Sequence, residues 1–568
     1  MSQLGFKLNF QLTCALACCA SFIYILVTTV SGILSLYSPI QHDDQIHFIL
    51  DLNKYLAGTY SWRDLLSFHN EHRLVFPRLF YFLDYFLASL TNKFNLVAIF
   101  CLQLLHFFLV IKVIFATTDQ KSKFFAASLF GITGSLFFNA AQLDNFTFGF
   151  QVCFILVYFA VSIAIFSMLR ACSAKSNAWF AASLGAGLVA NFSLGNGILI
   201  WPLLVGIAFV KRAHRLHLVT LFLSALVVIS LYLTNYTPLE SSTHRVLSPQ
   251  SLKFILHFIL ANVGNPIHGS GIFYSKILGL IILALTFYFT LFVLKNKSFS
   301  DRNLFLLSNL FFCLGSIGLA AASRFQFGIA LAVISRYVTT ASILIAYALI
   351  LCISLALEHQ KQRLANLMLI GATALVLCMS YLQRDYIAPF HGNNTLREIA
   401  ALALKLGIKD EELIRRIHLI PASKTLEAYA TLADLKLAEY HHAEELKLNQ
   451  TLDANYQPQK CLGSIELVSV IKQTDNYKLL RGWIYHGLKN SPKDKLYVLD
   501  SQNLVAGIGK IGYIRPDILS SQQNVKSIFT GFEVILKSNV LEQAPAALQF
   551  YVENHHTKVT CPISFRGH

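Results

Sequence analysis

The chain has 568 residues, of which 55% are hydrophobic and 13% are charged, and its mean hydropathy is +0.55. A soluble domain carries about 25% charged residues, so this composition excludes an ordinary soluble protein and predicts that most of the chain lies in lipid. The formal net charge of +16 does not indicate a nucleic-acid-binding protein, because the Lys and Arg residues stand in short clusters between apolar stretches.

A membrane-spanning helix needs about 20 consecutive apolar residues, and about eleven stretches of the chain approach that length. The predicted spans are residues 11–37, 94–117, 124–141, 148–169, 178–192, 197–210, 216–236, 272–294, 304–322, 335–357 and 364–382. The first is too long for the core of a signal peptide and predicts an uncleaved anchor. Leu74 to Leu90 is shorter and contains Arg78 and Asp84, which predicts an interfacial helix. Residues 1–382 are therefore interpreted as an α-helical polytopic transmembrane domain.

The basic clusters between these spans predict the orientation of the chain. With Leu74–Leu90 at the interface, all of them fall on one side, which is then the cytoplasm together with the N-terminus. They are residues 121–123, 170–175, 211–215, 295–302 and 359–363. The opposite side is interpreted as the periplasm of a bacterial inner (cytoplasmic) membrane, and it receives the loop 37–93 and the whole C-terminal tail.

The tail differs from the rest of the chain. Residues 383–458 combine apolar residues at helical spacing with many charges, interrupted at Pro421, and predict a soluble helical linker. Residues 459–568 alternate apolar and polar positions and predict a small β-sandwich. Its expected strands are 465–471, 477–485, 495–499, 504–508, 532–536 and 548–553. Cys461 and Cys561 stand at its two ends, where a disulfide is expected in an oxidising compartment; two buried free thiols are the alternative.

The first polar cluster of the transmembrane domain directly follows the first span. It contains Asp43 and Asp44, and Asp43 shares one face with His47 and Asp51 if the segment is helical. A carboxylate at the edge of a membrane cavity can act as a general base toward a sugar hydroxyl. Ionisable groups pressed against a membrane domain predict a functional site. The alternative is a solvated helix cap just outside the membrane.

The second polar cluster runs from His69 to Arg78 and contains Glu71, His72 and Arg73. Its His and Glu residues do not have the spacing of a metalloprotease helix. Contacts to a donor phosphate or sugar are the preferred interpretation, and a metal site or simple interfacial polarity are the alternatives. A lipid-phosphate leaving group needs cations, and Arg is favoured for its bidentate fit to phosphate. The candidates are Arg73, Arg78, Arg324 and Arg336.

Further candidates lie near the ends of later spans. Asp144 and Asn145 follow the third span, where Asp144 is either a second functional carboxylate or a helix terminus. Arg336 and Tyr337 open a late span, either as substrate contacts or as an ordinary interfacial anchor. His244 lies in a polar loop on the same side as the acidic pair and is a further substrate-binding candidate.

The order of these features resembles the GT-C superfamily of glycosyltransferases. Within it, the chain is similar to bacterial polyprenyl-phosphate-sugar-dependent transferases related to the protein mannosyltransferase and aminoarabinose transferase families. Asp43 and Asp44 match the position of their acidic pair after the first helix, and Asp144 falls where they place a second Asp. The stretch from Arg73 to Arg78 occupies the place of their Lys-Pro-Pro-Leu segment, although it has no Lys and one Pro. The resemblance covers the transmembrane domain.

The resemblance implies an inner-membrane glycosyltransferase with a GT-C-like fold. It would move a sugar from a polyprenyl-phosphate donor to an envelope glycan, such as lipopolysaccharide, or to a lipid acceptor on the periplasmic face, by inverting direct displacement. Asp43 is the expected general base, with Asp44 and Asp144 in support of the acceptor or a metal. No cofactor is called for, and a divalent metal is left open.

Two other classes of function remain as alternatives. A lipid-linked glycan transporter or flippase is disfavoured because the charges cluster at one face and no internal repeat is visible. An O-antigen-type polymerase shares the compartment and the arginines, but it would not need an acidic pair directly after the first span.

Overall fold

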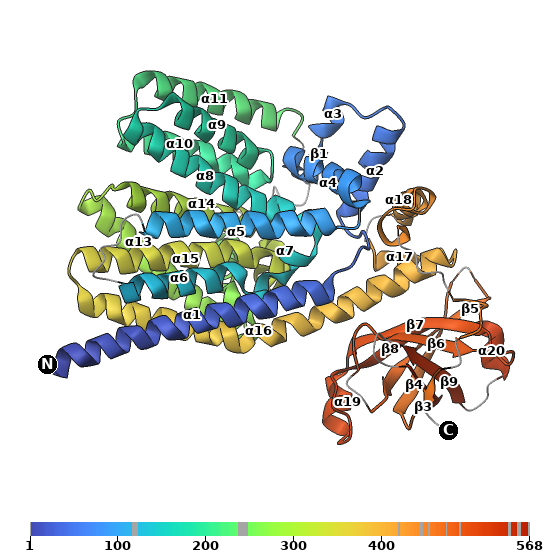
Figure 1. Ribbon diagram of the computed structural model, residues 1–568. Coiled ribbons are helices and arrows are strands. Elements are labelled where there is room, and N and C mark those ends of the chain that lie inside the picture. The colour runs from blue at the N-terminus through green and yellow to red at the C-terminus, as the bar shows by residue number, and fades with distance from the viewer. Residues whose placement is uncertain are drawn as a thin grey trace. The chain divides into compact units, whose positions relative to one another are not determined.

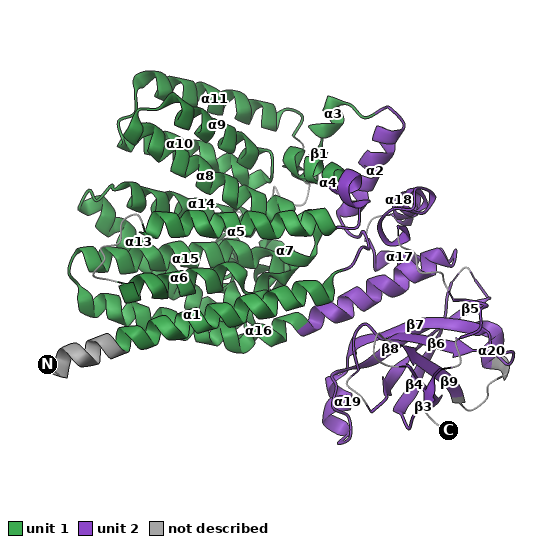
Figure 2. Cartoon of the chain, viewed as in Figure 1, with its two compact units in different colours: residues 1–37, 60–83, 93–387 green, residues 38–59, 84–92, 388–568 purple. Residues whose placement is uncertain are grey.

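The computed structural model describes residues 2–115, 123–236, 248–418, 421–441, 447–452, 455–472, 474–487, 490–543, 547–553 and 558–565. The chain forms two compact units, and each is assembled from separate stretches of sequence (Figure 2). Unit 1 consists of Met1–Tyr37, Tyr60–Leu83 and Lys93–Ile387, and unit 2 of Ser38–Thr59, Asp84–Asn92 and Ala388–His568. The polar loop after the first span is therefore divided between the two units.

Unit 1 is a bundle of helices (Figure 1). Its elements are α1 (Ser2–Leu36), α3 (Trp62–Leu65), β1 (Phe68–His69), β2 (His72–Arg73), α4 (Val75–Ala88), α5 (Lys93–Phe115), α6 (Lys123–Phe138), η2 (Ala140–Gln142), α7 (Leu143–Thr147), η3 (Gly149–Gln151), α8 (Val152–Ala174), α9 (Asn177–Asn191), η4 (Gly195–Leu199), α10 (Ile200–Val210), α11 (Arg215–Leu233), α12 (Pro249–Val263), η5 (Asn265–Ser270), α13 (Ile272–Lys295), α14 (Asp301–Arg324), η6 (Phe325–Phe327), η7 (Ile329–Val333), α15 (Ser335–Glu358) and α16 (Gln362–Lys405). The ends of α4 and α16 continue into unit 2. Among the described residues, nine helices are long and apolar enough to cross a membrane. This is the make-up of a multi-pass membrane protein, as the hydropathy predicts.

The count of nine helices is short of the eleven spans expected from the sequence. The difference lies in the expected spans 178–192 and 197–210. Helix α9 has 15 residues and measures about 22 Å at 1.5 Å per residue, which is less than the ~30 Å of a bilayer core. The apolar segment Gly195–Val210, which contains α10, is likewise shorter than 18 residues. These two helices are consecutive. Leaving both out therefore does not change the direction in which any other span is expected to cross the membrane.

Polar contacts group the ends of the helices in unit 1. At one end, Lys211 pairs with Asp301, and Arg302 pairs with Glu358, which joins the ends of α10 and α15 to the start of α14. The opposite end holds the turn between α6 and α8 and the turn between α14 and α15, which are linked by a hydrogen bond and an ion pair. The basic clusters near α10, α14 and α15 therefore gather at one end of the bundle, the pattern typical of a cytoplasmic face.

The turn between α6 and α8 consists of the short segments η2, α7 and η3. The last carbonyl groups of α6 are satisfied by side-chain amides, since Gln103 and Gln142 each donate to the carbonyl of Phe137 at 2.8 Å. Backbone polar groups inside a membrane must find partners within the protein. These amides therefore stabilise the helix end that places Asp144.

Unit 2 begins with a helical part. Its helices are α2 (Gln45–Leu56), the end of α16, α17 (Glu411–Arg415), α18 (Ala422–Asp434) and η8 (Ala438–Tyr440). Helix α2 packs on α18, and the Tyr429 hydroxyl donates to the carbonyl of Gln41 at 2.9 Å. The Gln45 side chain donates to Asn92 at 2.6 Å. The expected soluble linker is in part a continuation of the last span, because α16 runs through Pro389 without a break.

The rest of unit 2 is a β domain. Its elements are β3 (Gln457–Pro458), β4 (Leu462–Val470), β5 (Tyr477–Tyr485), β6 (Lys495–Leu499), β7 (Val505–Ile514), α19 (Pro516–Ser521), β8 (Phe529–Lys537), α20 (Ser538–Gln543), β9 (Ala547–Glu553) and β10 (Lys558–Ser564). The described strands form one sheet in the order β3-β10-β9-β6-β7-β8-β5-β4. A bridge between Ile465 and Phe565 joins β4 to the end of β10. The two-sheet sandwich expected from the sequence is thus replaced by one sheet closed on itself, here called the barrel. Alternation of residues predicts strands and faces, but it does not determine which strands pair.

Three glycines of β7, Gly507, Gly509 and Gly512, have the spacing of a dinucleotide-binding loop. They lie inside a strand, however, and not at a strand-to-helix turn, so they do not form a phosphate site. A Cβ at Gly509 would lie 2.1 Å from the carbonyl oxygen of Glu533, and one at Gly512 would lie 2.0 Å from Oγ1 of Thr395. The glycines therefore allow β7 to pack closely on β8 and on α16.

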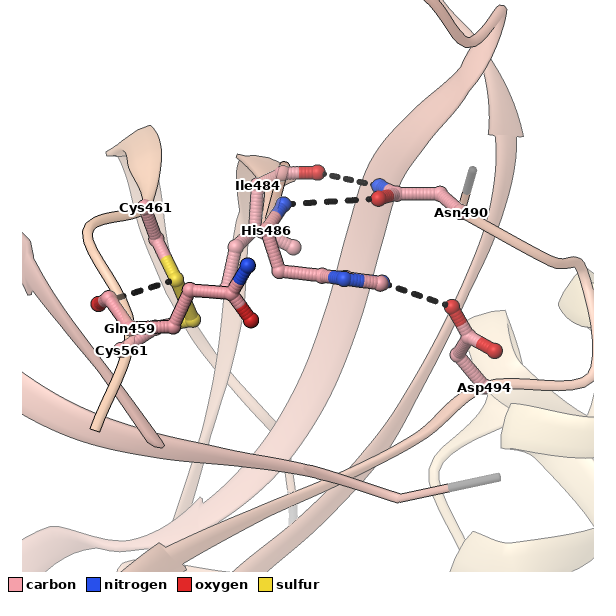
Figure 3. Close-up of a disulfide and its surroundings, with 7 residues drawn as sticks. All are labelled: Gln459, Cys461, Ile484, His486, Asn490, Asp494 and Cys561. Carbon is pink, nitrogen blue, oxygen red and sulfur yellow. Dashed lines mark hydrogen bonds and ion pairs between the residues drawn. A yellow bond between two sulfur atoms is a disulfide. The ribbon is translucent and has the colours of Figure 1, made fainter. Parts of the chain in front are cut away.

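Cys461 and Cys561 form a disulfide across 100 residues of sequence (Figure 3). The bond joins the start of β4 to β10. Figure 3 also shows His486 and Asp494, whose Nε2 and Oδ2 atoms lie 3.2 Å apart and whose side chains are fully buried. The disulfide and this polar pair both lie within the barrel.

Replacing Cys461 by serine is expected to lower the stability of the barrel by about 2–4 kcal/mol, because a cross-link over a long loop restricts the unfolded chain. Hydrogen exchange of peptides from β5 and β8 in the full-length protein measures this loss. Cys101→Ser, which changes an exposed free cysteine of α5, is the control. Equal exchange in Cys461→Ser and wild type would contradict the prediction.

Candidate functional site

Asp43 lies in unit 2, just before α2, and its position is fixed by three contacts. Its amide donates to the carbonyl oxygen of Ile417 at 2.8 Å. Its Oδ2 atom lies 2.9 Å from Nδ1 of His42 and 3.3 Å from Nη2 of Arg397. The side chain is still 40% exposed. The structure thus holds a carboxylate between two potential cations without burying it.

The electrostatic surroundings keep Asp43 ionised. Its partial removal from water alone would raise the pKa of the carboxyl group. The hydrogen bond with His42 and the charges of His42, Arg397 and His418 outweigh that effect, and they hold the pKa of Asp43 below its ordinary value. At neutral pH the carboxylate is therefore available as a hydrogen-bond acceptor or as a proton acceptor.

The neighbours Asp44 and His47 lie in the same unit. Asp44 occupies the N-cap position of α2 and is half-buried, but its side chain makes no capping hydrogen bond to the helix. His47 lies in the first turn of α2, and its ring centroid is 5.7 Å from that of His418. The simple helix-cap interpretation of the acidic pair therefore has no capping bond to support it.

The second polar cluster forms the β1–β2 hairpin of unit 1. The tight turn at Asn70 has a φ of +51°, which Asn tolerates better than most residues. At the tip of the hairpin, Oε2 of Glu71 lies 3.3 Å from Nη2 of Arg324, at the end of α14. His69 is buried, with its ring 5.4 Å from that of Phe150. The hairpin therefore directs its carboxylate to an arginine from a membrane helix.

His72 also lies in this hairpin, next to the turn between α9 and α10. A Cβ at Gly195 would lie 2.6 Å from Nδ1 of His72, so a larger residue there would force the His72 ring to move. Within the described part of the chain, no group of three or more His, Cys, Asp or Glu side chains is arranged to hold a metal ion.

Two of the four arginine candidates bind the protein's own backbone. Arg73 is buried over the ring of Phe68 and donates to the main-chain carbonyls of Leu66, Tyr232 and Thr234. Arg78 is buried as well. Its guanidinium donates to the carbonyls of Leu65 and Ser67 and to the Ser67 hydroxyl, at 3.0 to 3.1 Å. Both side chains stabilise the loop before α4, which leaves few donors for a substrate phosphate.

Asp144 lies in α7, within the turn between α6 and α8. Its amide donates to the Ser335 hydroxyl at 3.1 Å, and its Oδ2 lies 3.7 Å from Nε of Arg336. Asn145 donates to the carbonyl of Arg336 at 3.0 Å and to the Thr339 hydroxyl at 2.7 Å. These contacts bring together Asp144, Asn145 and Arg336, which the sequence singles out only as separate candidates.

The other two arginines are more accessible. Arg324 and Arg336 flank the turn between α14 and α15 and are 31% and 38% exposed. Each pairs with one carboxylate, and neither guanidinium is enclosed by main-chain carbonyls as Arg73 and Arg78 are. Tyr337 packs in the apolar cluster formed by α12 and the same turn. His244 lies outside the described residues.

The sequence-predicted residues thus fall into both units. Asp43, Asp44 and His47 lie in unit 2. Unit 1 holds His69, Glu71, His72, Arg73, Arg78, Asp144, Asn145, Arg324, Arg336 and Tyr337.

The sequence does not single out two residues that hold Asp43, namely Arg397 and Ile417. Arg397 is 354 residues away in sequence. The only signal was a charged residue among the apolar positions of a tail helix.

No protein-family model matches the chain, and no curated protein matches it. The site is therefore interpreted from its own geometry.

Proposed function

We propose that the chain is a glycosyltransferase that moves a sugar from a polyprenyl-phosphate donor to an envelope glycan or lipid acceptor. The observation that carries the proposal is the Asp144–Arg336 pair. Here a partly exposed arginine lies beside a carboxylate at a distance of 3.7 Å, where two membrane helices end. A lipid-linked donor keeps its tail in the bilayer, so its phosphate must lie at the ends of such helices.

Arginine suits this phosphate because its planar fork offers two parallel donors. Arg336 and Arg324 come from the two sides of one turn, and each is only partly engaged by its carboxylate. They are the proposed ligands of the donor phosphate. Arg73 and Arg78 instead support the loop that carries Glu71.

Asp43 is the proposed general base. The acceptor hydroxyl oxygen forms a bond to the anomeric carbon, the bond from that carbon to the phosphate oxygen breaks, and the hydroxyl proton passes to Asp43. The electron pair of the broken bond stays on the phosphate oxygen, so polyprenyl phosphate leaves with one more negative charge than the phosphate carried in the donor. Such a displacement inverts the anomeric centre. The basic clusters support an orientation with this chemistry on the periplasmic face of a bacterial inner membrane.

A transporter is the second candidate, and one observation favours it. His106 of α5 is fully buried in the bundle, with Nε2 at 2.8 Å from the Ser162 hydroxyl and 2.9 Å from the Tyr347 hydroxyl. Ionisable residues inside membrane domains often mark transport paths. His106→Gln separates the candidates, because a transporter requires this residue and the proposed transferase does not.

Replacing Arg336 by glutamine is expected to raise the KM for the lipid-phosphate donor about 10- to 100-fold, because a hydrogen bond to a charged group contributes about 1.5–3 kcal/mol. Transfer from a radiolabelled donor to acceptor by the purified protein in nanodiscs gives KM and kcat. Arg363→Gln, at the exposed start of α16, is the control and should behave like wild type. An unchanged donor KM in Arg336→Gln would remove Arg336 from the donor site.

The proposed function itself is tested by the mass profile of envelope glycans from a deletion strain. We expect one defined sugar unit to be missing and to return with the wild-type gene. An unchanged glycan profile after deletion would contradict glycan transfer.

A further inference from the structure

In unit 2, two pairs of consecutive residues connect Asp43 to the barrel. One residue of each pair contacts Asp43, and the other contacts the barrel. In α16, Arg397 contacts the Asp43 carboxylate at 3.3 Å, and its neighbour Glu398 forms an ion pair with Lys510 of β7. After α17, the carbonyl of Ile417 accepts the hydrogen bond of the Asp43 amide at 2.8 Å. The residue before it, Arg416, pairs with Glu533 of β8 at 2.7 Å.

The two barrel residues that receive these contacts are neighbours. Lys510 and Glu533 are direct partners in the antiparallel pairing of β7 with β8. Glu533 is 3% exposed and also accepts hydrogen bonds from Arg481 and, at 2.8 Å, from the Tyr513 hydroxyl. A buried carboxylate with this many donors is well fixed, and it keeps two of the three when one is removed. One rigid cross-strand pair therefore anchors both connections to Asp43.

An apolar core supports the same arrangement. Residues of α16 and α17, such as Ile399 and Leu413, share a buried cluster with Leu479 of β5 and Ile535 of β8. The close approach of Gly512 to Thr395 adds a second contact between β7 and α16. Ion pairs and apolar packing thus join these helices to the barrel as one packed body.

Asp43 needs such support because its backbone has a φ of +48°. This left-handed conformation is uncommon for residues other than glycine and is strained. The hydrogen bond to Ile417 holds the backbone in that conformation, and Arg397 holds the side chain. Both supports come from the tail of the chain and not from the loop itself.

We infer that the barrel is the scaffold that positions Asp43, and that Arg397 is a positioning residue for this carboxylate, anchored through Glu398 and Lys510. The inference rests on the proposed role of Asp43 as general base. It gives the barrel a task in the transfer step that does not depend on binding glycan. The charged or titratable groups that face Asp43 are His42, Arg397 and His418.

The scaffold is tested without reference to activity by hydrogen exchange of the full-length protein in nanodiscs. Arg416→Gln removes the link to Glu533, and peptides that cover residues 38–56 are expected to exchange about tenfold faster. Peptides from β5 and β8 should keep wild-type exchange, which shows that the barrel stays folded. Arg415→Gln is the matched control, because Arg415 is 69% exposed and pairs only with Glu411 among the described residues. Unchanged exchange of residues 38–56 in Arg416→Gln would overturn the inference.

The role of Arg397 is tested by the pH profile of transfer. Arg397→Gln is expected to shift the acidic limb of kcat to higher pH by about one unit, because a nearby positive charge favours the ionised carboxylate. The donor KM should not change, and Arg397→Lys should restore most of the wild-type profile. A wild-type pH profile in Arg397→Gln overturns the inference. If the wild-type protein shows no sugar transfer, the proposed function is contradicted. The hydrogen-exchange test of the barrel as a scaffold is not affected by that result.

Discussion

Asp43→Asn is expected to lower sugar transfer at least 100-fold while the protein stays folded, because a positioned general base contributes about 10²- to 10⁴-fold to such a reaction. The amide keeps the size of the side chain but accepts no proton at neutral pH. The left-handed backbone of residue 43 tolerates asparagine well, since Asn is enriched in that region. The loss should therefore appear in kcat and not in the amount of folded protein.

The measurement is the envelope glycan profile of the deletion strain complemented with each variant at equal expression, together with kcat of the purified protein. Asp434→Asn changes an exposed carboxylate at the end of α18, in the same unit, and serves as the control. If Asp43→Asn restores the glycan profile fully, Asp43 is not the base. The buried His106 would then become the first residue to examine.

The membrane character of the chain could be predicted from composition and run length, but the count of spans could not. Hydropathy identifies apolar stretches, and the stretches at α9 and α10 are as apolar as the others. Helix α9 has 15 residues, as many as the expected span 178–192, and α10 begins three residues later than the expected span 197–210. Both are too short to cross a bilayer core of about 30 Å. A run of apolar residues gives no direct measure of the helix that forms within it.

The candidate site could be predicted in part, because its residues stand out against an apolar background. The grouping of Asp144, Asn145 and Arg336 follows from contacts between the turn after α6 and the start of α15, and the sequence indicates these residues only one by one. The difference between Arg73 and Arg336 could not be predicted. Both are arginines near helix ends, and only the structure shows that carbonyls from a loop and from the end of α11 surround Arg73.

The strands of the barrel could be predicted in part, but their pairing could not. Period-two alternation predicts β5 and β6 with their observed bounds. It misses β10, whose residues Lys558–Ser564 include a proline. Pairing depends on residues far apart in sequence, so one closed sheet and two facing sheets give the same local pattern.

The buried Glu439 is expected to make the stability of unit 2 depend on pH. It is 8% exposed, and the ammonium group of Lys405 contacts the Glu439 main-chain carbonyl at 2.9 Å. Burial raises the pKa of Glu439 to about 7, and the charge of Lys405 offsets this only in part. The carboxyl group therefore takes up a proton in the folded protein at a pH where the unfolded chain has already lost it.

The sign of the effect follows from this difference in pKa. Below about pH 4.5 the group is protonated in both states and costs nothing. Between about pH 4.5 and 7 the unfolded chain ionises first, so the free energy of unfolding falls as pH rises, by about 3 kcal/mol in all. Above pH 7 the loss is complete. Glu439→Gln, which imitates the protonated form, should therefore stabilise unit 2 at pH 8 and have little effect at pH 5.

Hydrogen exchange of peptides from α18 and η8, measured at pH 5 and pH 8 and corrected for intrinsic rates, tests this expectation. Glu427→Gln is the matched control, because Glu427 lies on the exposed face of α18 and should leave the pH dependence unchanged. If wild type and Glu439→Gln are equally protected at pH 8, ionisation of Glu439 does not lower the free energy of unfolding. Tyr429 of α18 also holds Gln41, which lies next to Asp43 in sequence. If residues 38–56 lose protection at high pH in the wild type and not in Glu439→Gln, the titration of Glu439 is connected to the loop that carries Asp43.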